Sequence, residues 1–405
     1  MSLLSAFSSR EQCLREQIQI SNRIRAFPHT YHADPSVFFR ALEGQSLLIS
    51  GGRPQDRAAV LLGAARSAPP GTPTVLLHNG NPALMSSAFT DQPGLQARVW
   101  TYDPLPGLSR GQQLALLTAG SQEEMAIFWA FALDVCQALG LPERLASLAS
   151  IQWTAIQWQQ QVIHTCPMDQ AADLIARYDR DMAKLAAQAD LHLARIQPGG
   201  AFLDLPPCSL EEGLALGRLL IIPMLGGPGS PMLAQCLEVL TAAMRRGVSF
   251  QLLLDNVPLP TRHPLVYSPA AQVQLVLAAD DLCALAGDPA DLTTRSCGAV
   301  LFRHAAPASA ARLSLHFFGD YDRLVLEQHV GFSRSAARPL DRSAQQSLTT
   351  REVKDLRLPT HLIQTLPLGT ACVRLPAQNA EGVFPFCPPD SQIHIDRVFH
   401  ERRGG

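Results

Sequence analysis

The chain has 405 residues, of which 47% are hydrophobic and 17% are charged. This is enough apolar material for a large core and for two globular units. Its formal net charge of −2 excludes a chain-wide basic field of the kind that holds DNA without sequence preference. The nine cysteines form no C-x-x-C pair, so we expect reduced thiols in a cytoplasmic protein.

The first stretch predicts a helix and no membrane anchor. Residues 1–43 read as an N-terminal helical extension with an amphipathic helix at Ser9–Ala26. No window approaches the roughly 18 consecutive apolar residues that a transmembrane helix needs. The start of the chain also lacks the apolar core and cleavage site of a signal peptide. We therefore expect no membrane segment.

The stretch Gln45–Ala65 predicts a buried strand, a tight turn and a helix. This is how a phosphate loop, G-x-x-x-x-G-K-[ST], is built: its backbone N–H groups wrap phosphates while a lysine and a hydroxyl complete the site. Gly51 and Gly52 preserve the beginning of such a loop. The sequence thus predicts a phosphate-loop frame at this turn.

The chemistry of that frame is altered at three successive positions. Asp56 replaces the second glycine, Arg57 the lysine and Ala58 the Mg²⁺-binding hydroxyl. A carboxylate here repels phosphate, yet it suits a helix N-terminus as an N-cap. We expect Asp56 to cap the helix itself, leaving a vestigial phosphate loop.

Two further strands and a long helical block follow. The strands end at His78 and Asp103, which should lie with Gly51 along one carboxyl edge of a largely parallel sheet, where such folds bind ligands. Residues 109–197 then show helical periodicity throughout. The tryptophans of this block have no interleaved basic residues, so we expect core packing rather than base stacking. They are Trp129, Trp153 and Trp158.

The most strand-like run, Val248–Pro260, carries the acidic position of a nucleotide-hydrolysing site. An aspartate at the end of such a strand holds Mg²⁺, and a following glutamate polarises water. Here Asp255 is followed by Asn256, which cannot accept a proton from water. A loop aspartate that merely caps the next turn remains the alternative for Asp255.

The last third predicts strands and a polar segment. One buried strand ends at Asp280 and Asp281, whose side chains should point to opposite faces and so share no site. We expect a mobile polar segment over residues 338–353, a strand pair over residues 361–375, and a loosely structured, proline-rich tail.

These elements together predict an α/β fold: a mainly parallel, P-loop NTPase-like (RecA-like) sheet with helices on both faces and an inserted all-helical subdomain. The expected divisions are listed in chain order. They are an N-terminal extension (1–43), the α/β domain in two segments (44–108 and 198–376), the helical insertion (109–197) and the C-terminal tail (377–405).

The order of these motifs resembles the cytoplasmic ATPase domain of conjugative coupling proteins, the FtsK- and HerA-related DNA translocases of type IV secretion. The likeness spans roughly residues 40–376 and lies in SLLISGGRPQDRA, VLLHNGNPAL, ARVWTYDPLPGLS before the helical block, FQLLLDNVP, and LVLAADDLCALAGD through FFGDYD. The resemblance implies a role in DNA transfer. It also implies that Gly51–Arg57 and Asp255 lie next to each other at the carboxyl edge of adjacent strands. The family's N-terminal membrane segment and its intact phosphate-loop, acidic and glutamine motifs do not recur here.

Three functions follow as hypotheses. The favoured one is a non-catalytic pseudo-ATPase that binds protein partners of a conjugation or secretion machine and takes no cofactor. The alternative is a divergent ATP-binding translocase, an ATPase with Mg²⁺ on Asp255, phosphate on Arg57 and hexameric assembly. In that case Arg303 or Arg351 would be an arginine finger.

The third hypothesis is a DNA-binding structural subunit. The neutral charge disfavours it unless several arginines form one patch. These are Arg245, Arg246, Arg397, Arg402 and Arg403.

Overall fold

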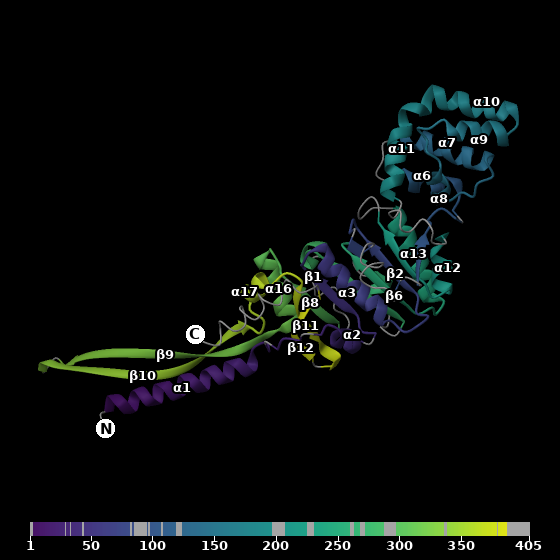
Figure 1. Cartoon of the computed structure of the whole chain (residues 1–405). Helices are drawn as coiled ribbons and strands as arrows, with labels where there is room; N and C mark the ends of the chain where they lie inside the picture. The colour runs from purple at the N-terminus through teal and green to yellow at the C-terminus, as the bar shows by residue number, and fades with distance from the viewer. Residues whose placement is uncertain are drawn as a thin grey trace.

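The computed structural model describes residues 3–386 except 29, 33, 43, 82, 85–94, 96–97, 107, 119–123, 197–206, 225–230, 260–262, 268–271, 287–296, 336–337 and 379. The molecule is elongated (Figure 1). A central sheet carries a helical insertion at one end and a long projecting arm at the other.

The central sheet has ten strands among the described residues, in the order β12-β11-β8-β1-β7-β6-β2-β5-β3-β4. Neighbouring strands are parallel except for β11, which runs antiparallel to both β8 and β12. The strands are β1 (Leu47–Ser50), β2 (Thr74–His78), β3 (Val99–Tyr102), β4 (Pro207–Cys208), β5 (Leu219–Pro223), β6 (Phe250–Asp255), β7 (Val273–Ala279), β8 (Gly298–Phe302), β11 (Thr370–Leu375) and β12 (Ala380–Pro385). The predicted mainly parallel sheet is confirmed.

Continuous apolar runs form these strands because both faces of the sheet are covered. Along β1, Leu47 and Ile49 pack into one hydrophobic cluster while Leu48 packs into the other. Along β6, Leu253 joins the first cluster, and Leu252 and Leu254 join the second. A strand buried on both sides needs apolar residues at every position, which is why period-two alternation is missing from the sequence.

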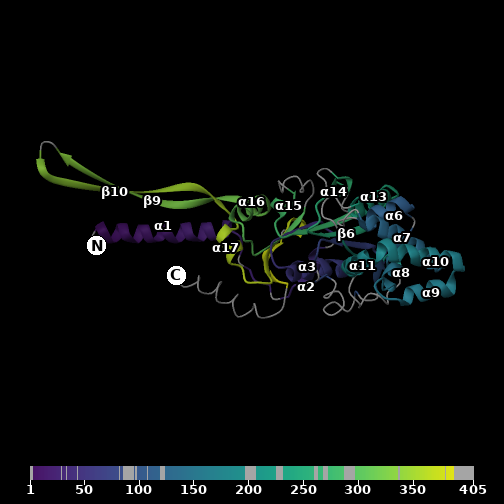
Figure 2. The ribbon, with the colours of Figure 1, turned by 90° about the horizontal axis from the view of Figure 1, so that it is seen from above.

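Helices supply the two covering layers. On one face lie α2 (Ser36–Leu42) and α3 (Pro54–Ser67), and on the other α13 (Pro231–Arg245) and α16 (Pro307–Phe318). Figure 2 shows α3 and α13 on opposite sides of β6. Shorter helices complete the layers: α12 (Leu210–Ala215), α14 (Pro264–Tyr267), α15 (Leu282–Ala286) and α17 (Thr360–Thr365).

Among the described residues between β3 and β4, the regular elements are all helices, joined by loops. They are α6 (Arg110–Leu117), α7 (Glu124–Ala138), α8 (Leu145–Ser150), α9 (Gln157–Thr165), α10 (Met168–Arg177), the π-helical turn η1 (Tyr178–Met182) and α11 (Ala183–Ile196). Their core is aromatic: the ring centroids of Trp153 and Trp158 lie 5.8 Å apart, and those of Trp158 and Tyr178 lie 4.9 Å apart. The core role predicted for the tryptophans is confirmed.

The arm consists of a two-stranded antiparallel ribbon and the N-terminal helix. The ribbon is β9 (Asp320–Ser335) paired with β10 (Arg338–Leu356), and α1 (Leu3–Arg25) lies along β9 (Figures 1 and 2). The prediction of a mobile polar segment at 338–353 was wrong. A ribbon exposed to water on one face needs little apolar sequence, so its strands carry no strong hydrophobic signal.

Two side chains fix the arm to itself and to the body. The amide of Asn22 bonds both backbone groups of Leu324, donating to its oxygen (2.9 Å) and accepting from its nitrogen (2.8 Å). At the base, Arg357 forms a two-pronged ion pair with Glu381 on β12, and its Nε donates to the Arg25 carbonyl. Ribbon, helix and sheet are thus joined at one guanidinium.

Two predictions for the end of the chain require correction. Residues 361–375 contain α17 and a single strand, β11, because the segment before β11 packs Leu362 and Ile363 into the core as one helical turn. Residues 380–385 of the expected loose tail form β12, in which the consecutive residues Gly382, Val383 and Phe384 are buried. Residues 387–405, including Arg397, Arg402 and Arg403, lie outside the described residues.

Within the described residues, none of the helices combines the length and the apolar character needed to span a bilayer.

Candidate functional site

The turn between β1 and α3 has the backbone shape of a tight glycine loop. Gly51 and Gly52 both adopt positive φ, 82° and 75°. Pro54 begins the helix, and Arg53 is the N-cap residue. Asp56 therefore lies at the third helical position. The expectation that it is itself the N-cap was wrong, because the helix begins earlier, at the proline.

The Asp56 carboxylate nevertheless closes the helix start. Its Oδ2 accepts from the backbone N–H of Arg53 (2.9 Å), and both oxygens bind the Arg53 guanidinium. The side chain of Asp56 is only 1% exposed. A carboxylate thus neutralises the positive end of the helix dipole from within the chain.

The amides of the turn already have acceptors inside the sheet. The N–H of Gly51 donates to the Ala279 carbonyl (3.0 Å), and that of Gly52 donates to the Arg303 carbonyl (3.1 Å). A Cβ on Gly51 would lie 2.7 Å from the Arg303 oxygen, so only glycine fits this close approach. Two amides that a phosphate loop would offer to a ligand therefore donate to carbonyls of β7 and of the residue after β8.

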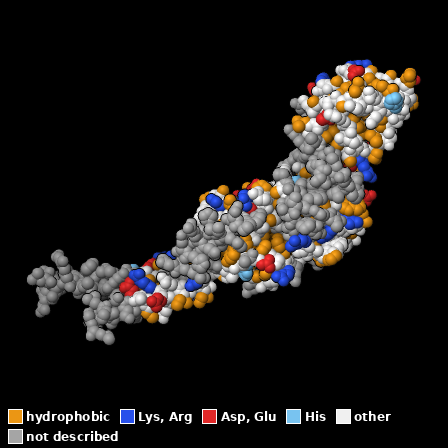
Figure 3. Space-filling model, viewed as in Figure 1, with side chains coloured by type: hydrophobic (Ala, Val, Ile, Leu, Met, Phe, Trp, Pro, Cys, Tyr) orange, Lys and Arg blue, Asp and Glu red, His pale blue; other side chains and the backbone are white. Residues whose placement is uncertain are grey.

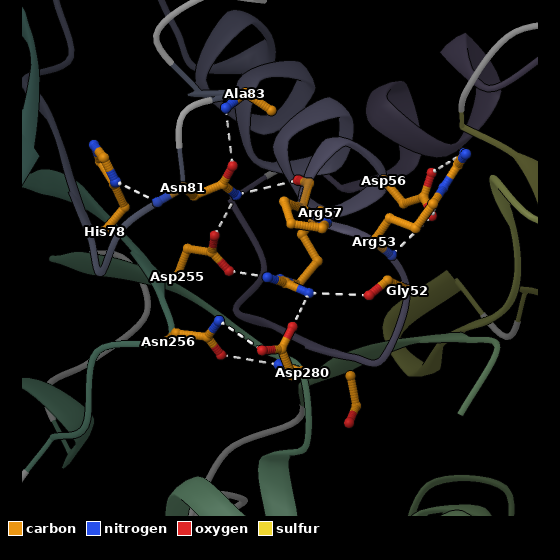
Figure 4. A network of polar contacts seen from close by, with 12 residues as sticks. Gly52, Arg53, Asp56, Arg57, His78, Asn81, Ala83, Asp255, Asn256 and Asp280 are labelled. Atoms are coloured by element: carbon orange, nitrogen blue, oxygen red, sulfur yellow. Dashed lines mark hydrogen bonds and ion pairs between the residues drawn. The ribbon is translucent and has the colours of Figure 1, made fainter. Parts of the chain in front are cut away.

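Polar side chains meet between the β1–α3 turn and the carboxyl ends of β6 and β7, a place called the corner below, and Arg57 lies at its centre (Figure 4). Its Nε donates to Asp255 Oδ1 (2.7 Å), and its Nη1 donates to the Gly52 carbonyl (3.1 Å) and pairs with Asp280. The Arg57 side chain is only 2% exposed. A guanidinium is rarely buried so fully unless its charge is matched, and here two carboxylates and a carbonyl match it.

The phosphate-loop turn and Asp255 meet as predicted, but not on adjacent strands. β7 lies between β1 and β6. Two strand spacings are about 10 Å, which the long side chain of Arg57 bridges from the helix above. The prediction that β1 and β6 are adjacent strands was therefore wrong. The predicted closeness of the turn and Asp255 is seen in the ion pair between the Arg57 and Asp255 side chains.

The environment of Asp255 is dry and fully bonded. The side chain is 0% exposed, and its Oδ2 accepts from Asn81 Nδ2 (2.5 Å) while Oδ1 accepts from Arg57. Burial raises the pKa of the Asp255 carboxyl, and the charge of Arg57 and the Asn81 bond oppose that rise. Both oxygens are thus held by side chains from α3 and the loop after β2.

Asn256 has a conformational role. Its φ of 53° lies in the left-handed region, which asparagine tolerates better than most side chains. Its amide accepts from the backbone N–H of Asp280 (2.9 Å) and donates to the Asp280 carboxylate (3.2 Å). Asn256 therefore positions the second carboxylate of the Arg57 network.

Sequence reasoning missed Asn81 and Asp280 as members of this cluster. Asp280 directly follows β7, and Asn81 comes three residues after the end of β2, at the same carboxyl edge as Asp255. That placement was a usable signal, but nothing in the sequence indicates that Arg57 would be their common partner. Asp281 joins a different group, where it accepts from Ser309 Oγ (2.6 Å) and lies 3.6 Å from His304 Nε2, so the predicted separation of the two aspartates is observed.

His78 borders the network at the end of β2. Its Nδ1 accepts from the backbone N–H of Asn81 (3.1 Å), and the ring is 4% exposed. Burial lowers the pKa of His78 to about 4, so the ring is neutral at physiological pH. It therefore adds no positive charge for a phosphate.

Asp103, which we predicted at the same edge, lies outside the Arg57 network and makes hydrogen bonds to the backbone. It is buried after β3 and accepts from the backbone N–H groups of Leu105 and Leu145. Burial raises the pKa of its carboxyl. The side chain thus joins the sheet to the start of α8.

The candidate arginine fingers lie in different places. Arg303 is exposed directly after β8, beside the glycine turn. Arg351 lies on the ribbon, 69% exposed, and pairs with Glu327 on the opposite strand (3.4 Å). Ala58 is buried in α3, and Arg245 and Arg246 are exposed at the end of α13.

No cluster of three or more metal-ligating side chains occurs among the residues that the structure describes. The corner holds an ion-pair network in which the Arg57 and Asp255 side chains are buried and the Asp280 side chain is 69% exposed. Its carboxylates are engaged by arginine and asparagine, and it contains no lysine or hydroxyl at the positions expected from a phosphate loop.

The architecture is an α/β fold of the P-loop NTPase-like kind, a large, mainly parallel sheet with helices on both faces. Among solved structures, the chain is similar to the bacterial conjugative coupling protein TrwB. For the unbound monoclinic form the TM-score is 0.43 at 15% identity, covering 86% of this chain and 87% of that one.

Two further TrwB structures give similar values. One is a complex with the non-hydrolysable GTP analogue GDPNP, with a TM-score of 0.42, 15% identity and 86% of each chain covered. The other is a complex with ADP and Mg²⁺, with a TM-score of 0.41, 14% identity, and 85% and 86% covered. No protein-family model matches the chain, and no curated protein sequence matches it.

Proposed function

We propose that this protein is a non-catalytic homologue of conjugative coupling proteins, a pseudo-ATPase that serves as a protein-binding component of a conjugation or type IV secretion machine. The observation that carries the proposal is the occupation of the phosphate corner by Arg57, Asp255 and Asp280. ATP would have to displace a buried guanidinium and approach Asp56 with its own negative charge. No nucleotide or metal is assigned to the site.

The backbone amides of the turn support the same conclusion. Phosphate recognition by a glycine loop depends on N–H groups that point freely at the ligand. Those of Gly51, Gly52 and Arg53 donate to two strand carbonyls and a carboxylate. Exchanging one side chain would therefore not free all three N–H groups for a phosphate.

A surface for protein partners is available on the helical insertion. Residues 145–168 contain no Asp, Glu, Lys or Arg. Within this stretch Ile156 (62% exposed), Ile163 (57%) and Met168 (86%) face solvent. Figure 3 shows hydrophobic side chains dispersed over this end of the molecule. An uncharged surface with exposed aliphatic residues suits a protein rather than a nucleic-acid backbone.

The test is a titration with ATP by calorimetry, in the presence and in the absence of Mg²⁺, followed by a turnover assay. We expect no binding at micromolar ATP and no turnover. The matched variant combines Asp56→Gly, Arg57→Lys and Ala58→Thr, and Asp255→Ala is the turnover control. If the native chain binds Mg-ATP at micromolar concentration, or hydrolyses it faster than Asp255→Ala, the divergent-translocase function replaces this one.

A further inference from the structure

The helix of the arm, α1, has two distinct faces. Leu14, Ile18 and Asn22 are spaced by four residues and are partly buried on the side of β9. A second stripe follows 4-3-4 spacing and is exposed along its whole length. It consists of Cys13, Gln17, Ile20 and Ile24.

The second stripe has the pattern of a coiled-coil seam. A 4-3-4 spacing places residues on one line along a helix, as positions a and d do in a heptad. Ile20 is 61% exposed and Ile24 is 78% exposed, which are large values for aliphatic side chains that start an ordered arm. The helix therefore presents two exposed isoleucines, Ile20 and Ile24, in line with Gln17 and Cys13 on a face distinct from the one that meets its own ribbon.

We propose that a second copy of this chain covers this stripe, with the two α1 helices packed antiparallel. In that arrangement Ile24 lies opposite the partner's Cys13, and Ile20 lies opposite the partner's Gln17. The exposed side chains of Glu16 and Arg23 flank the seam at the g position. Antiparallel pairing sets Glu16 against the partner's Arg23, and the two-fold axis repeats the pair.

The charges decide against the parallel arrangement. Parallel helices would place Gln17 against the partner's Gln17 in the seam and would leave Glu16 without an opposite charge across it. The antiparallel pair is self-complementary, as a two-fold interface requires.

The length of the arm determines how the two copies would meet. α1 has 23 residues and is about 35 Å long, and it leaves the body with its C-terminal end at the base. Antiparallel pairing therefore puts the two bodies at opposite ends of the helix pair. The ribbon, at about 50 Å, is longer, so its outer part would run beside the partner's body.

A cross-linking experiment on the full chain tests the arrangement directly. Ile24→Cys places a thiol opposite the partner's native Cys13, which is exposed. We expect mild oxidation to give a covalent dimer on a non-reducing gel, and the dimer to disappear when Cys13→Ser is added. Gln19→Cys, exposed on the far side of α1, is the matched control and should stay monomeric.

The outcomes separate the alternatives. If Ile24→Cys forms no more covalent dimer than Gln19→Cys does, the proposal is overturned. Efficient Cys13-dependent dimer from the unmodified chain would indicate parallel packing and overturns it as well. None of these results depends on nucleotide binding, so the proposed function is tested separately.

Sedimentation equilibrium gives a measure without cross-linking. Ile20→Glu with Ile24→Glu should raise the dissociation constant at least about a hundredfold, since four isoleucines leave the interface. Glu16→Arg alone should raise it roughly three- to tenfold, and adding Arg23→Glu should restore it. Failure of the double charge exchange to restore association contradicts the antiparallel register. All four positions are exposed, so circular dichroism should report an unchanged fold.

Discussion

The corner around Arg57 and the ribbon of the arm use the same charged residue types under opposite conditions. Arg57 and Asp255 are almost completely buried and hold each other across two strand spacings. On the ribbon, Arg351 with Glu327 and Arg323 with Asp355 pair in solvent. The buried pair is indispensable because each charge would be stranded without the other, while water can replace either partner on the ribbon.

The largest expected difference comes from breaking the buried pair. Asp255→Ala leaves the Arg57 guanidinium in the core with one strong partner fewer, and we expect a loss of about 3–5 kcal/mol in the free energy of unfolding. Urea denaturation followed by circular dichroism measures it. Adding Arg57→Met should recover part of the loss because the stranded charge is removed. A cost below about 1 kcal/mol for Asp255→Ala would place this pair with the ribbon pairs.

The second prediction concerns His78, whose neutrality preserves the charge balance of the corner. Its pKa is lowered to about 4 in the folded chain, against 6.5 for the free side chain. Between those values the unfolded chain binds the proton more tightly. The contribution of the neutral His78 ring to the free energy of unfolding is complete above pH 6.5. It is lost as pH falls towards 4, by about 3 kcal/mol in total.

Denaturation curves at pH 7, 5.5 and 4.5 for the native chain and His78→Asn check this. Asparagine can still accept from the Asn81 N–H but does not titrate in this range, so the variant should show a flatter pH dependence. His164→Asn, at an exposed position of α9, is the control and should keep the native slope. Equal slopes for His78→Asn and the native chain would contradict the assignment.

The smallest effect is expected on the ribbon. Glu327→Ala removes the partner of Arg351, which is itself 69% exposed, and should change the free energy of unfolding by no more than about 1 kcal/mol. The melting temperature in low and high salt measures it, and the difference between native and variant should shrink as salt rises. A loss comparable to that of Asp255→Ala would remove the contrast between the two regions.

The sequence predicted those parts of the fold that are set by local pattern. Apolar runs of four to seven residues identified the doubly covered strands, and glycine with proline marked the turn that begins α3. β10 was missed because its stability comes from pairing with β9, which a polar sequence does not reveal. In the site, the residue types at Arg57 and Asn256 were visible in the sequence, but their contacts were not. The Arg57–Asp255 contact joins residues 198 apart, and the Asn256–Asp280 contact joins residues 24 apart at the ends of neighbouring strands.

Arg357 gives the arm a mechanical property. It joins the base of the ribbon to β12 through Glu381 and to the end of α1 through the Arg25 carbonyl, while the Phe27 amide donates back to the Arg357 carbonyl (2.9 Å). Because both the helix and the ribbon are bonded at this point, a swing of the arm about its base would have to break these bonds. A force applied near its tip, about 50 Å away, acts through a stiff lever on the edge of the central sheet.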